Sequence, residues 1–199
     1  RRVGPRRVAL DPDLAPATLW DPRITGVSTG PAADRFVRSP DPRIPLPSND
    51  ADIAFAPVTT LSRWIESKAL SSERLTNIYL SRIAQFDPKL KSVITVTKDL
   101  ALAAAKRADA EIAAGKYRGP LHGVPITIKE NVDYEGRPNP NGVAAQMNII
   151  APSDAPVVRN LRKAGAIVIG LTNTPEFSFR GFTDNPLHGL TLNPWDPDI

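Results

Sequence analysis

The sequence predicts an α/β fold with parallel strand pairing, and three observations indicate it. Apolar residues recur at steps of three and four between residues 71 and 88, as in an amphipathic helix. The run Ala-Ile-Val-Ile-Gly at residues 166–170 is continuously apolar, which is typical of a strand buried on both faces. A helical segment leads into a short strand twice, at residues 99–129 and 154–170, the order expected of parallel pairing.

A proline-rich N-terminal arm is predicted for residues 1–52, before the globular part. Nine of the 21 prolines fall in the first 50 residues, and repeated Asp-Pro pairs deny this segment helices and central strands. Trp20 and Phe36 are candidate anchors, so that disorder and docking on a neighbouring surface both stay open. The globular part is expected to start near Ile53 and to occupy residues 53–199.

Two helices are predicted next. A short helix starts with Thr60 as its N-cap, and a longer helix starts at Ser71 or Ser72. The Asp87-Pro88 pair is expected to end the longer helix.

A strand, a helix and a second strand are then expected in turn. Residues 92–97 (Ser-Val-Ile-Thr-Val-Thr) predict the first strand. Residues 99–114 are alanine-rich and helical, with Gly115 as the C-cap. Residues 124–129 form the second strand.

A last helix and strand complete the predicted fold. Ser153 or Asp154 is the expected N-cap, Pro156 lies in the first turn, and Gly165 ends the helix before the strand at residues 166–170. Four apolar side chains of this helix are expected to face inward: Val157, Val158, Leu161 and Ala164. The tail from residue 175 to residue 199 is predicted to be rich in loops.

The composition excludes several classes of site. No apolar run reaches the length of a membrane span, so a membrane partner is not expected. The net charge of +4 comes from scattered basic residues, which is weak support for a nucleic-acid partner. Without cysteine, this chain has no disulfide scaffold, thiolate zinc site or cysteine nucleophile. With His122 and His188 as the only histidines, we expect no metal site, and no cofactor motif is present.

The most informative stretch is residues 119–131, Gly-Pro-Leu-His-Gly-Val-Pro-Ile-Thr-Ile-Lys-Glu-Asn. Alternation along the strand turns Thr127 and Lys129 to one face and Ile128 to the other. If the strand is buried between helices, the loss of hydration lowers the pKa of a lysine amine and allows it to act as a neutral base. The alternative is a solvated charge on an edge strand, and spacing alone does not decide between the two.

Other polar residues are less specific. We interpret Glu130 and Asp133 as solvated loop charges, His122 as a turn residue, and His188 as a loop residue without an evident partner. The chain contains neither a Gly-rich phosphate-binding motif nor a Gly-x-Ser-x-Gly elbow.

Thr172 and Asn173 are the candidate substrate-binding residues. They directly follow the last strand, and ligand-binding loops in open α/β sheets lie beyond the carboxyl ends of strands. The alternative is a hydrogen-bonded Asn turn before Pro175.

Taken together, these segments resemble the amidase signature family. Residues 119–131 look like the strand that carries that family's catalytic lysine, and residues 154–177 are similar to its helix-strand block. Residues 192–197 resemble the approach to its serine-rich signature, and the helix at residues 71–88 also fits. The resemblance covers about residues 53–199 and implies the N-terminal portion of a mixed sheet surrounded by helices.

The resemblance also implies a reaction, the hydrolysis of a carboxamide C–N bond to a carboxylate and ammonia or an amine by a Ser, cis-Ser, Lys triad. A neutral Lys129 would take a proton from the bridging serine, which activates the nucleophilic serine, and backbone N–H groups would stabilise the oxyanion. The serines and the Gly/Ser-rich loop would follow Ile199, because Ser153 and Ser178 lack such surroundings and are not assigned. We therefore expect the isolated chain to be inactive.

One segment departs from the family pattern. A Gly-x-Pro-Thr-Thr-x-Gly-Ser stretch commonly follows the lysine, whereas residues 136–143 here are Gly-Arg-Pro-Asn-Pro-Asn-Gly-Val. The loss of the threonines and the serine predicts altered hydrogen bonding around Lys129.

Two other functions stay open. One is a truncated, non-catalytic homologue that serves as a binding or assembly module and exposes an apolar patch. The other is an amidotransferase A-type subunit that acts on charged tRNA. The expected partners are a small-molecule amide and the remainder of the amidase domain beyond Ile199, and homo-oligomerisation is left open. A cytoplasmic location is favoured, with export open because the chain begins at Arg1 and not at methionine.

Overall fold

The computed structural model describes residue 26 and residues 43–198, and the chain divides into two units, Arg1–Pro40 and Asp41–Ile199. Trp20 and Phe36, the candidate anchors of the arm, lie outside the described residues. The short helix α1 (Asp50–Ala54) spans the predicted end of the arm, and its N-cap Asn49 accepts a hydrogen bond from the backbone N–H of Asp52 at 2.8 Å.

Helices α2 (Val58–Glu66) and α3 (Ser72–Leu90) confirm the two predicted helices but not all of their ends. Pro57 precedes α2, so the predicted cap at Thr60 is wrong. Ser71 caps α3 as expected, since its hydroxyl accepts from the backbone N–H of Arg74 at 3.0 Å.

Helix α3 does not end at Asp87-Pro88. Pro88 lies inside the helix, which continues for two more residues to Leu90 and ends at Lys91 in the left-handed conformation. The Asp87 carboxylate holds the following turn, because its Oδ1 accepts from the backbone N–H groups of Ser92 and Val93 at 2.8 and 2.9 Å.

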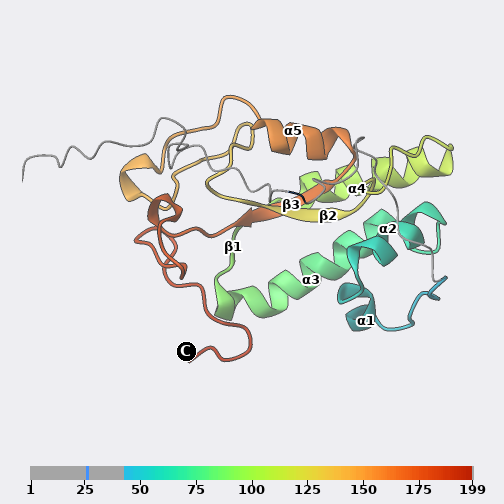
Figure 1. Ribbon diagram of the computed structural model, residues 1–199, viewed down its shortest axis with the longest axis horizontal. Helices are drawn as coiled ribbons and strands as arrows, with labels where there is room; N and C mark the ends of the chain where they lie inside the picture. Colours follow the sequence, from blue (N-terminus) through green and yellow to red (C-terminus); the bar gives the residue numbers. More distant parts are fainter. Residues whose placement is uncertain (1–25, 27–42, 199) are drawn as a thin grey trace, which may run out of the picture. The chain divides into compact units, whose positions relative to one another are not determined.

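Three strands form the sheet in the order β1-β3-β2 (Figure 1). Strands β2 (Pro125–Lys129) and β3 (Ile167–Thr172) are parallel, as predicted. Strand β1 (Val93–Val96) pairs with β3 in the antiparallel direction, so the sheet is mixed. Helix α4 (Lys98–Ala113) connects β1 to the segment before β2, and Ala114, not Gly115, is its C-cap.

Helix α5 (Pro156–Lys163) lies between β2 and β3 in the chain, with Pro156 in its first turn as predicted. Its N-cap is Ala155 without a side-chain bond, so the predicted Ser153 or Asp154 cap is wrong. Asp154 instead pairs with Arg162, Oδ2 to Nη1 at 2.5 Å. Val158 is fully buried, whereas Val157, expected to face inward, is 55% exposed.

The two faces of the sheet carry different helices. Residues Ile167 and Ile169 of β3 pack in a cluster with α3 and α4, while Val168 and Leu171 pack on the other face with Val158 of α5. Figure 1 shows α3 and α5 on opposite sides of the strands. A third cluster joins α1, α2 and α3. Apolar packing therefore covers both faces of β3.

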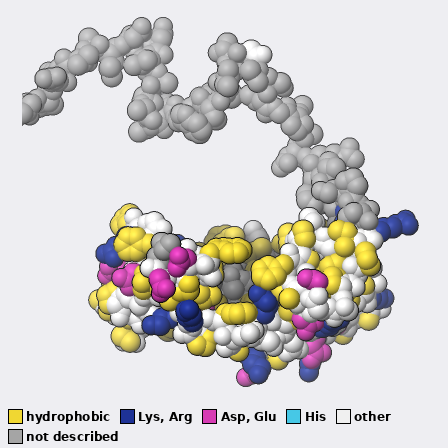
Figure 2. Space-filling view, turned by 90° about the horizontal axis from the view of Figure 1, so that it is seen from below, with side chains coloured by type: hydrophobic (Ala, Val, Ile, Leu, Met, Phe, Trp, Pro, Cys, Tyr) yellow, Lys and Arg dark blue, Asp and Glu magenta, His cyan; other side chains and the backbone are white. Residues whose placement is uncertain are grey.

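Two short 3-10 helices, η1 (Ala144–Gln146) and η2 (Glu176–Ser178), lie in the loops after β2 and β3. Among the described helices, none is both long and apolar enough to span a membrane. Apolar side chains also remain on the surface, as Figure 2 shows for one face, where they mix with charged groups. Phe55, Phe86 and Phe179 are large exposed examples.

Candidate active site

The candidate site lies where β2 and β3 end side by side. Because the two strands are parallel, Lys129 at the end of β2 is the register partner of Thr172 at the end of β3. Asn173 follows directly. The structure thus brings the three site residues predicted from the sequence to the carboxyl ends of β2 and β3. Open α/β sheets bind their ligands at this end of the strands.

Lys129 lies on an open part of the sheet surface. Its side chain is exposed, as is that of Thr127 on the same face. Helices α3 and α4 pack against β3 on this face, and they leave the end of β2 uncovered. Of the two alternatives that the sequence left open, Lys129 fits the second within the described residues: its side chain is exposed on β2, which lies at the edge of the three-stranded sheet.

Ser178, which the sequence left unassigned, is the centre of the hydrogen bonds around Lys129. Its Oγ accepts from Lys129 Nζ at 3.2 Å and from Asn131 Nδ2 at 2.9 Å, and it lies 2.9 Å from Thr174 Oγ1. Thr174 Oγ1 in turn donates to the carbonyl of Pro175 at 3.2 Å. With both acceptor positions in use, the Ser178 hydroxyl is left to donate to Thr174. Ser178 therefore orients the amine and is not set up as a nucleophile.

The backbone of η2 points Ser178 at the lysine. Phe177 and Ser178 both have positive φ angles, 52° and 59°, which non-glycine residues rarely adopt. The turn is held because the N–H of Phe177 donates to the carbonyl of Asn141 at 3.0 Å and that of Ser178 to Pro175 at 2.9 Å. Such conformations cost about 1–3 kcal/mol each and persist where surrounding contacts determine them. The sequence carries no glycine or Asn signal that would have revealed this turn.

Asn131 offers a free acceptor beside the amine. Its Nδ2 donates a hydrogen bond to Ser178 Oγ, but its Oδ1 is buried without a hydrogen-bond partner among residues 43–198. A buried carbonyl oxygen without a partner costs about 1–3 kcal/mol. Asn131 therefore holds Ser178 through its amide nitrogen, while its buried oxygen has no partner within the described residues.

The side chain of Asn173 is buried and engaged in local structure. Its Oδ1 accepts from the N–H of Thr174 at 2.9 Å and from Asn185 Nδ2 at 2.7 Å, and its Nδ2 donates to Thr191 Oγ1 at 3.0 Å. These bonds tie the end of β3 to the loop at residues 185–191. The side chain of Thr172 makes no hydrogen bond within the described part of the chain. The substrate-binding role of Thr172 and Asn173 stays a prediction.

Glu130 is not a solvated loop charge, contrary to its interpretation from the sequence. It is 2% exposed, because alternation places it on the same face as the buried Ile128. Its Oε1 lies 2.8 Å from His188 Nε2, and its Oε2 accepts from the N–H of Gly142 at 3.3 Å. His188, which was interpreted as a loop residue without an evident partner, thus joins its loop to the end of β2. Asp133 accepts a hydrogen bond from Asn139 at 2.6 Å.

The atypical segment at residues 136–143 supports the site through its backbone. Gly142 donates its N–H to Glu130, and the carbonyl of Asn141 accepts from η2. Gly142 has φ +72°, and a Cβ there would lie 3.0 Å from the backbone of residues 174–176. A side chain at position 142 would therefore push η2 away from Lys129.

Metal chemistry has no ligand set in this region: among the described residues, no group of three or more His, Asp or Glu side chains is placed to hold a metal ion. What the site does supply is a primary amine held by a hydroxyl and an amide at the carboxyl end of a strand. A lysine amine in such a position can move a proton to or from a hydroxyl that approaches its free side.

Comparison with known proteins finds relatives in sequence and in structure. Residues 74–199 match the family model described as Amidase. The chain is 67% identical over 135 residues to an indoleacetamide hydrolase of Bradyrhizobium diazoefficiens, a match that covers 68% of this chain and 26% of that protein. It is 40% identical over 141 residues to the A-type subunit of the glutamyl-tRNA(Gln) amidotransferase of Trichodesmium erythraeum, covering 71% of this chain and 29% of the relative.

A solved structure shares the fold. The native peptide amidase of Stenotrophomonas maltophilia superposes with a TM-score of 0.66 at 38% sequence identity, over 72% of this chain and 31% of that protein. The chain spans about a quarter of the length of the curated relatives named above.

Proposed function

The chain belongs to the amidase family, and we propose on this basis that it forms part of a hydrolase that cleaves the C–N bond of a carboxamide. Its products are a carboxylate and ammonia or an amine. The observation that carries the proposal is the position of the Lys129 amine, at the carboxyl end of β2 and within hydrogen-bond distance of Ser178.

In the proposed reaction, Lys129 is the base. Its neutral amine accepts a proton from a bridging serine, and that serine activates a second serine that attacks the amide carbon. Backbone N–H groups then stabilise the oxyanion. Neither serine is assigned within this chain, since the Ser178 oxygen is already occupied by Lys129 and Asn131.

The exposed surface around Lys129 is where the rest of the catalytic apparatus is proposed to pack. Thr127 and Lys129 leave an open face at the end of β2. A segment that brings the serines over this face would remove water from the amine, and desolvation favours the neutral form that a base requires. The 199-residue chain alone is therefore expected to have no amidase activity.

An aryl-acetamide is the proposed substrate class. The support is the 67% identity to a protein named indoleacetamide hydrolase, against 40% to an amidotransferase component. The test uses the protein that contains this chain together with the catalytic serines. Its kcat/KM is measured for indole-3-acetamide, a C-terminal peptide amide and glutamine.

The proposal expects indole-3-acetamide to be the best substrate, and Lys129→Ala to lower its turnover by about three or more orders of magnitude, since the members of a triad act as a unit. The matched control is Lys116→Ala, which removes an exposed lysine before β2 and should leave the rate unchanged. Turnover by Lys129→Ala close to the unsubstituted rate would refute the role of Lys129. A preference for the peptide amide would refute the substrate class alone.

Amide transfer to charged tRNA is the second candidate, supported by the 40% identity to the A-type component of an amidotransferase. The substrate measurements separate the two. Hydrolysis of glutamine that depends on charged tRNA favours amide transfer, and hydrolysis of indole-3-acetamide without tRNA favours the first proposal.

A further inference from the structure

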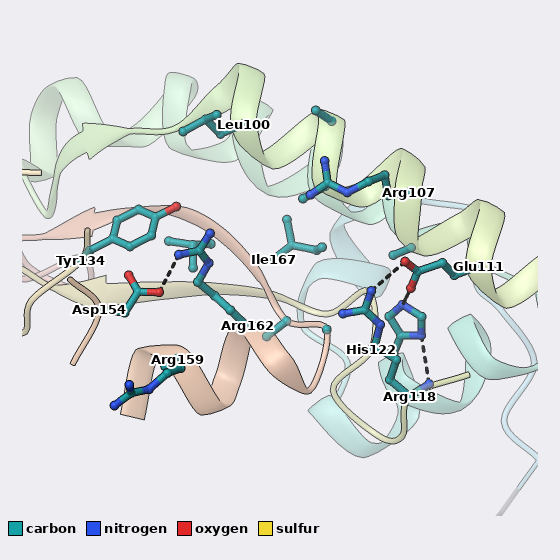
Figure 3. A pocket seen from close by; sticks show the side chains of 16 residues that line it. Leu100, Arg107, Glu111, Arg118, His122, Tyr134, Asp154, Arg159, Arg162 and Ile167 are labelled. Atoms are coloured by element: carbon teal, nitrogen blue, oxygen red, sulfur yellow. Dashed lines mark hydrogen bonds and ion pairs between the residues drawn. The ribbon is translucent and has the colours of Figure 1, made fainter. Parts of the chain in front are cut away.

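A polar cavity lies between α4 and α5 (Figure 3). Its volume is about 460 Å³. It is lined by Gly165 and Ile167 at the start of β3, whereas Lys129 is paired with Thr172 at the end of that strand. Five residues of strand at about 3.3 Å each separate the two ends by roughly 16 Å. Tyr134, in the loop after β2, also lines the cavity, but none of Lys129, Thr172, Asn173 and Ser178 does, so the cavity is distinct from the candidate active site.

The walls of the cavity are rich in arginine. Arg107 and Arg118 come from α4 and the segment after it, and Arg159 and Arg162 come from α5. The lining includes two carboxylates, each paired with one arginine: Glu111 with Arg118 at 2.6 Å and Asp154 with Arg162 at 2.5 Å.

Two positive charges of the lining are left uncompensated. Neither the Arg107 nor the Arg159 side chain forms a hydrogen bond or ion pair with any other residue in the range 43–198. His122, at one end of the cavity, adds no positive charge near neutral pH, because burial lowers its pKa from the ordinary value of 6.5. The cavity therefore carries a net charge of about +2, which favours an anion.

The paired arginines are held in place before any ligand arrives. Asp154 engages only Nη1 of Arg162, and the Arg162 guanidinium also lies over the ring of Tyr134, 5.5 Å from its centroid. Figure 3 shows the side chains of Arg107 and Arg162 extending from α4 and α5 into the space between the two helices. Guanidinium groups bind carboxylates through two parallel hydrogen bonds, and a fixed guanidinium loses little entropy on binding.

The remaining lining is apolar. Leu100, Ala103 and Ala104 of α4 face the cavity together with Ile167 and Val168 of β3. An inorganic ion would leave this surface in contact with water, whereas an apolar body would cover it.

We propose that this cavity binds a small organic carboxylate. The carboxylate lies between Arg107 and Arg162, and the apolar body rests on Leu100, Ala104 and Ile167. A carboxylate is also what amide hydrolysis releases, but the proposal does not rest on the proposed function, because binding is measured without turnover.

Phenylacetate is titrated into the 199-residue chain, and its binding is measured by calorimetry and by backbone amide NMR. Phenylacetamide is the neutral isostere, and inorganic phosphate is the anion without an apolar body. The expected result is saturable binding of phenylacetate, with at least tenfold weaker binding of the other two. The amide shifts should concentrate at α4, α5 and Gly165.

Matched variants locate the site. Arg107→Gln removes an exposed guanidinium and is expected to weaken phenylacetate binding at least tenfold. Arg74→Gln removes a surface arginine that pairs with Asp50 on α1 and should change the affinity less than twofold. Ala104→Leu fills the cavity without altering charge and should also weaken binding at least tenfold.

Three results would overturn the proposal. They are equal affinity for phenylacetate and phenylacetamide, phosphate binding as tight as that of phenylacetate, or an Arg107→Gln variant that binds as the Arg74→Gln variant does.

Discussion

The buried Glu130 carboxylate gives the most quantitative prediction, because its contacts can be counted. Glu130→Ala removes the acceptor of the Gly142 N–H and of His188 Nε2. A buried N–H left without a partner costs about 1–3 kcal/mol, and a hydrogen bond to a charged group contributes about 1.5–3 kcal/mol. His188 is 28% exposed, so water replaces part of the second contribution. The expected loss in the free energy of unfolding is about 2–4 kcal/mol.

Thermal and urea unfolding, followed by circular dichroism, measure this loss. For a domain of this size, about 2–4 kcal/mol corresponds to a fall in Tm of roughly 5–15 °C. Glu130→Gln keeps the volume and two hydrogen-bonding atoms, and should cost no more than about 1 kcal/mol. The matched control is Glu135→Ala, since Glu135 is exposed and its carboxylate forms no hydrogen bond or ion pair with a described residue. If Glu130→Ala is no more destabilising than Glu135→Ala, the buried network around the end of β2 is refuted.

Three further predictions concern the site and its support. Ser178→Ala should lower kcat of the complete enzyme roughly tenfold or more, since Lys129 loses its orienting acceptor, while costing only about 1 kcal/mol of stability. Gly165→Ala should destabilise by about 2–5 kcal/mol, because the position has φ +90° and a Cβ would lie 2.5 Å from His122 Cδ2, whereas Gly181→Ala meets no atom within 4 Å and should be near neutral. The unfolding free energy should fall as the pH drops below 6.5. Burial lowers the folded-state pKa of His122, so the folded state favours the neutral ring. The resulting contribution to the unfolding free energy is complete above the unfolded-state pKa of 6.5, and it is lost as the pH falls from 6.5 to the folded-state pKa.

Each of these has an outcome that contradicts it. Unchanged kcat in Ser178→Ala would mean that the serine does not orient the lysine. Equal stability of the two glycine variants would remove the packing argument for position 165. The pH effect is checked in His122→Gln, whose amide can still donate to Glu111 but does not titrate. A stability slope below pH 6.5 that persists in this variant would assign the effect to another group.

The sequence predicted the sheet better than the helix ends. All three strands follow from apolar runs, and the parallel pair follows from the helix that connects β2 to β3. The antiparallel direction of β1 did not follow, because the alanine-rich α4 connects β1 to β2, which is not its neighbour in the sheet. The predicted end of α3 at Asp87-Pro88 was wrong because the helix continues through Pro88 to Leu90. The Asp87 carboxylate stabilises the turn that follows.

The candidate site was predicted in part. The positions of Lys129, Thr172 and Asn173 follow from strand alternation and parallel register. Ser178 could not be placed, because two consecutive left-handed residues bring it back to β2 and neither is a residue type that favours that conformation. The pairing of Glu130 with His188 joins positions 58 residues apart, and periodicity does not reveal such contacts.

Chemical rescue of the amine tests the role of Lys129 most directly. The chain has no cysteine, so Lys129→Cys introduces its only thiol, and alkylation with 2-bromoethylamine restores an amine of nearly the same length. In the complete enzyme, Lys129→Cys should lose about three or more orders of magnitude in kcat, and alkylation should recover at least a hundredfold. Unsubstituted enzyme and Lys116→Cys, treated identically, should keep their rates. Near-normal turnover by Lys129→Cys, or no recovery on alkylation, would contradict the assignment of Lys129 as the base.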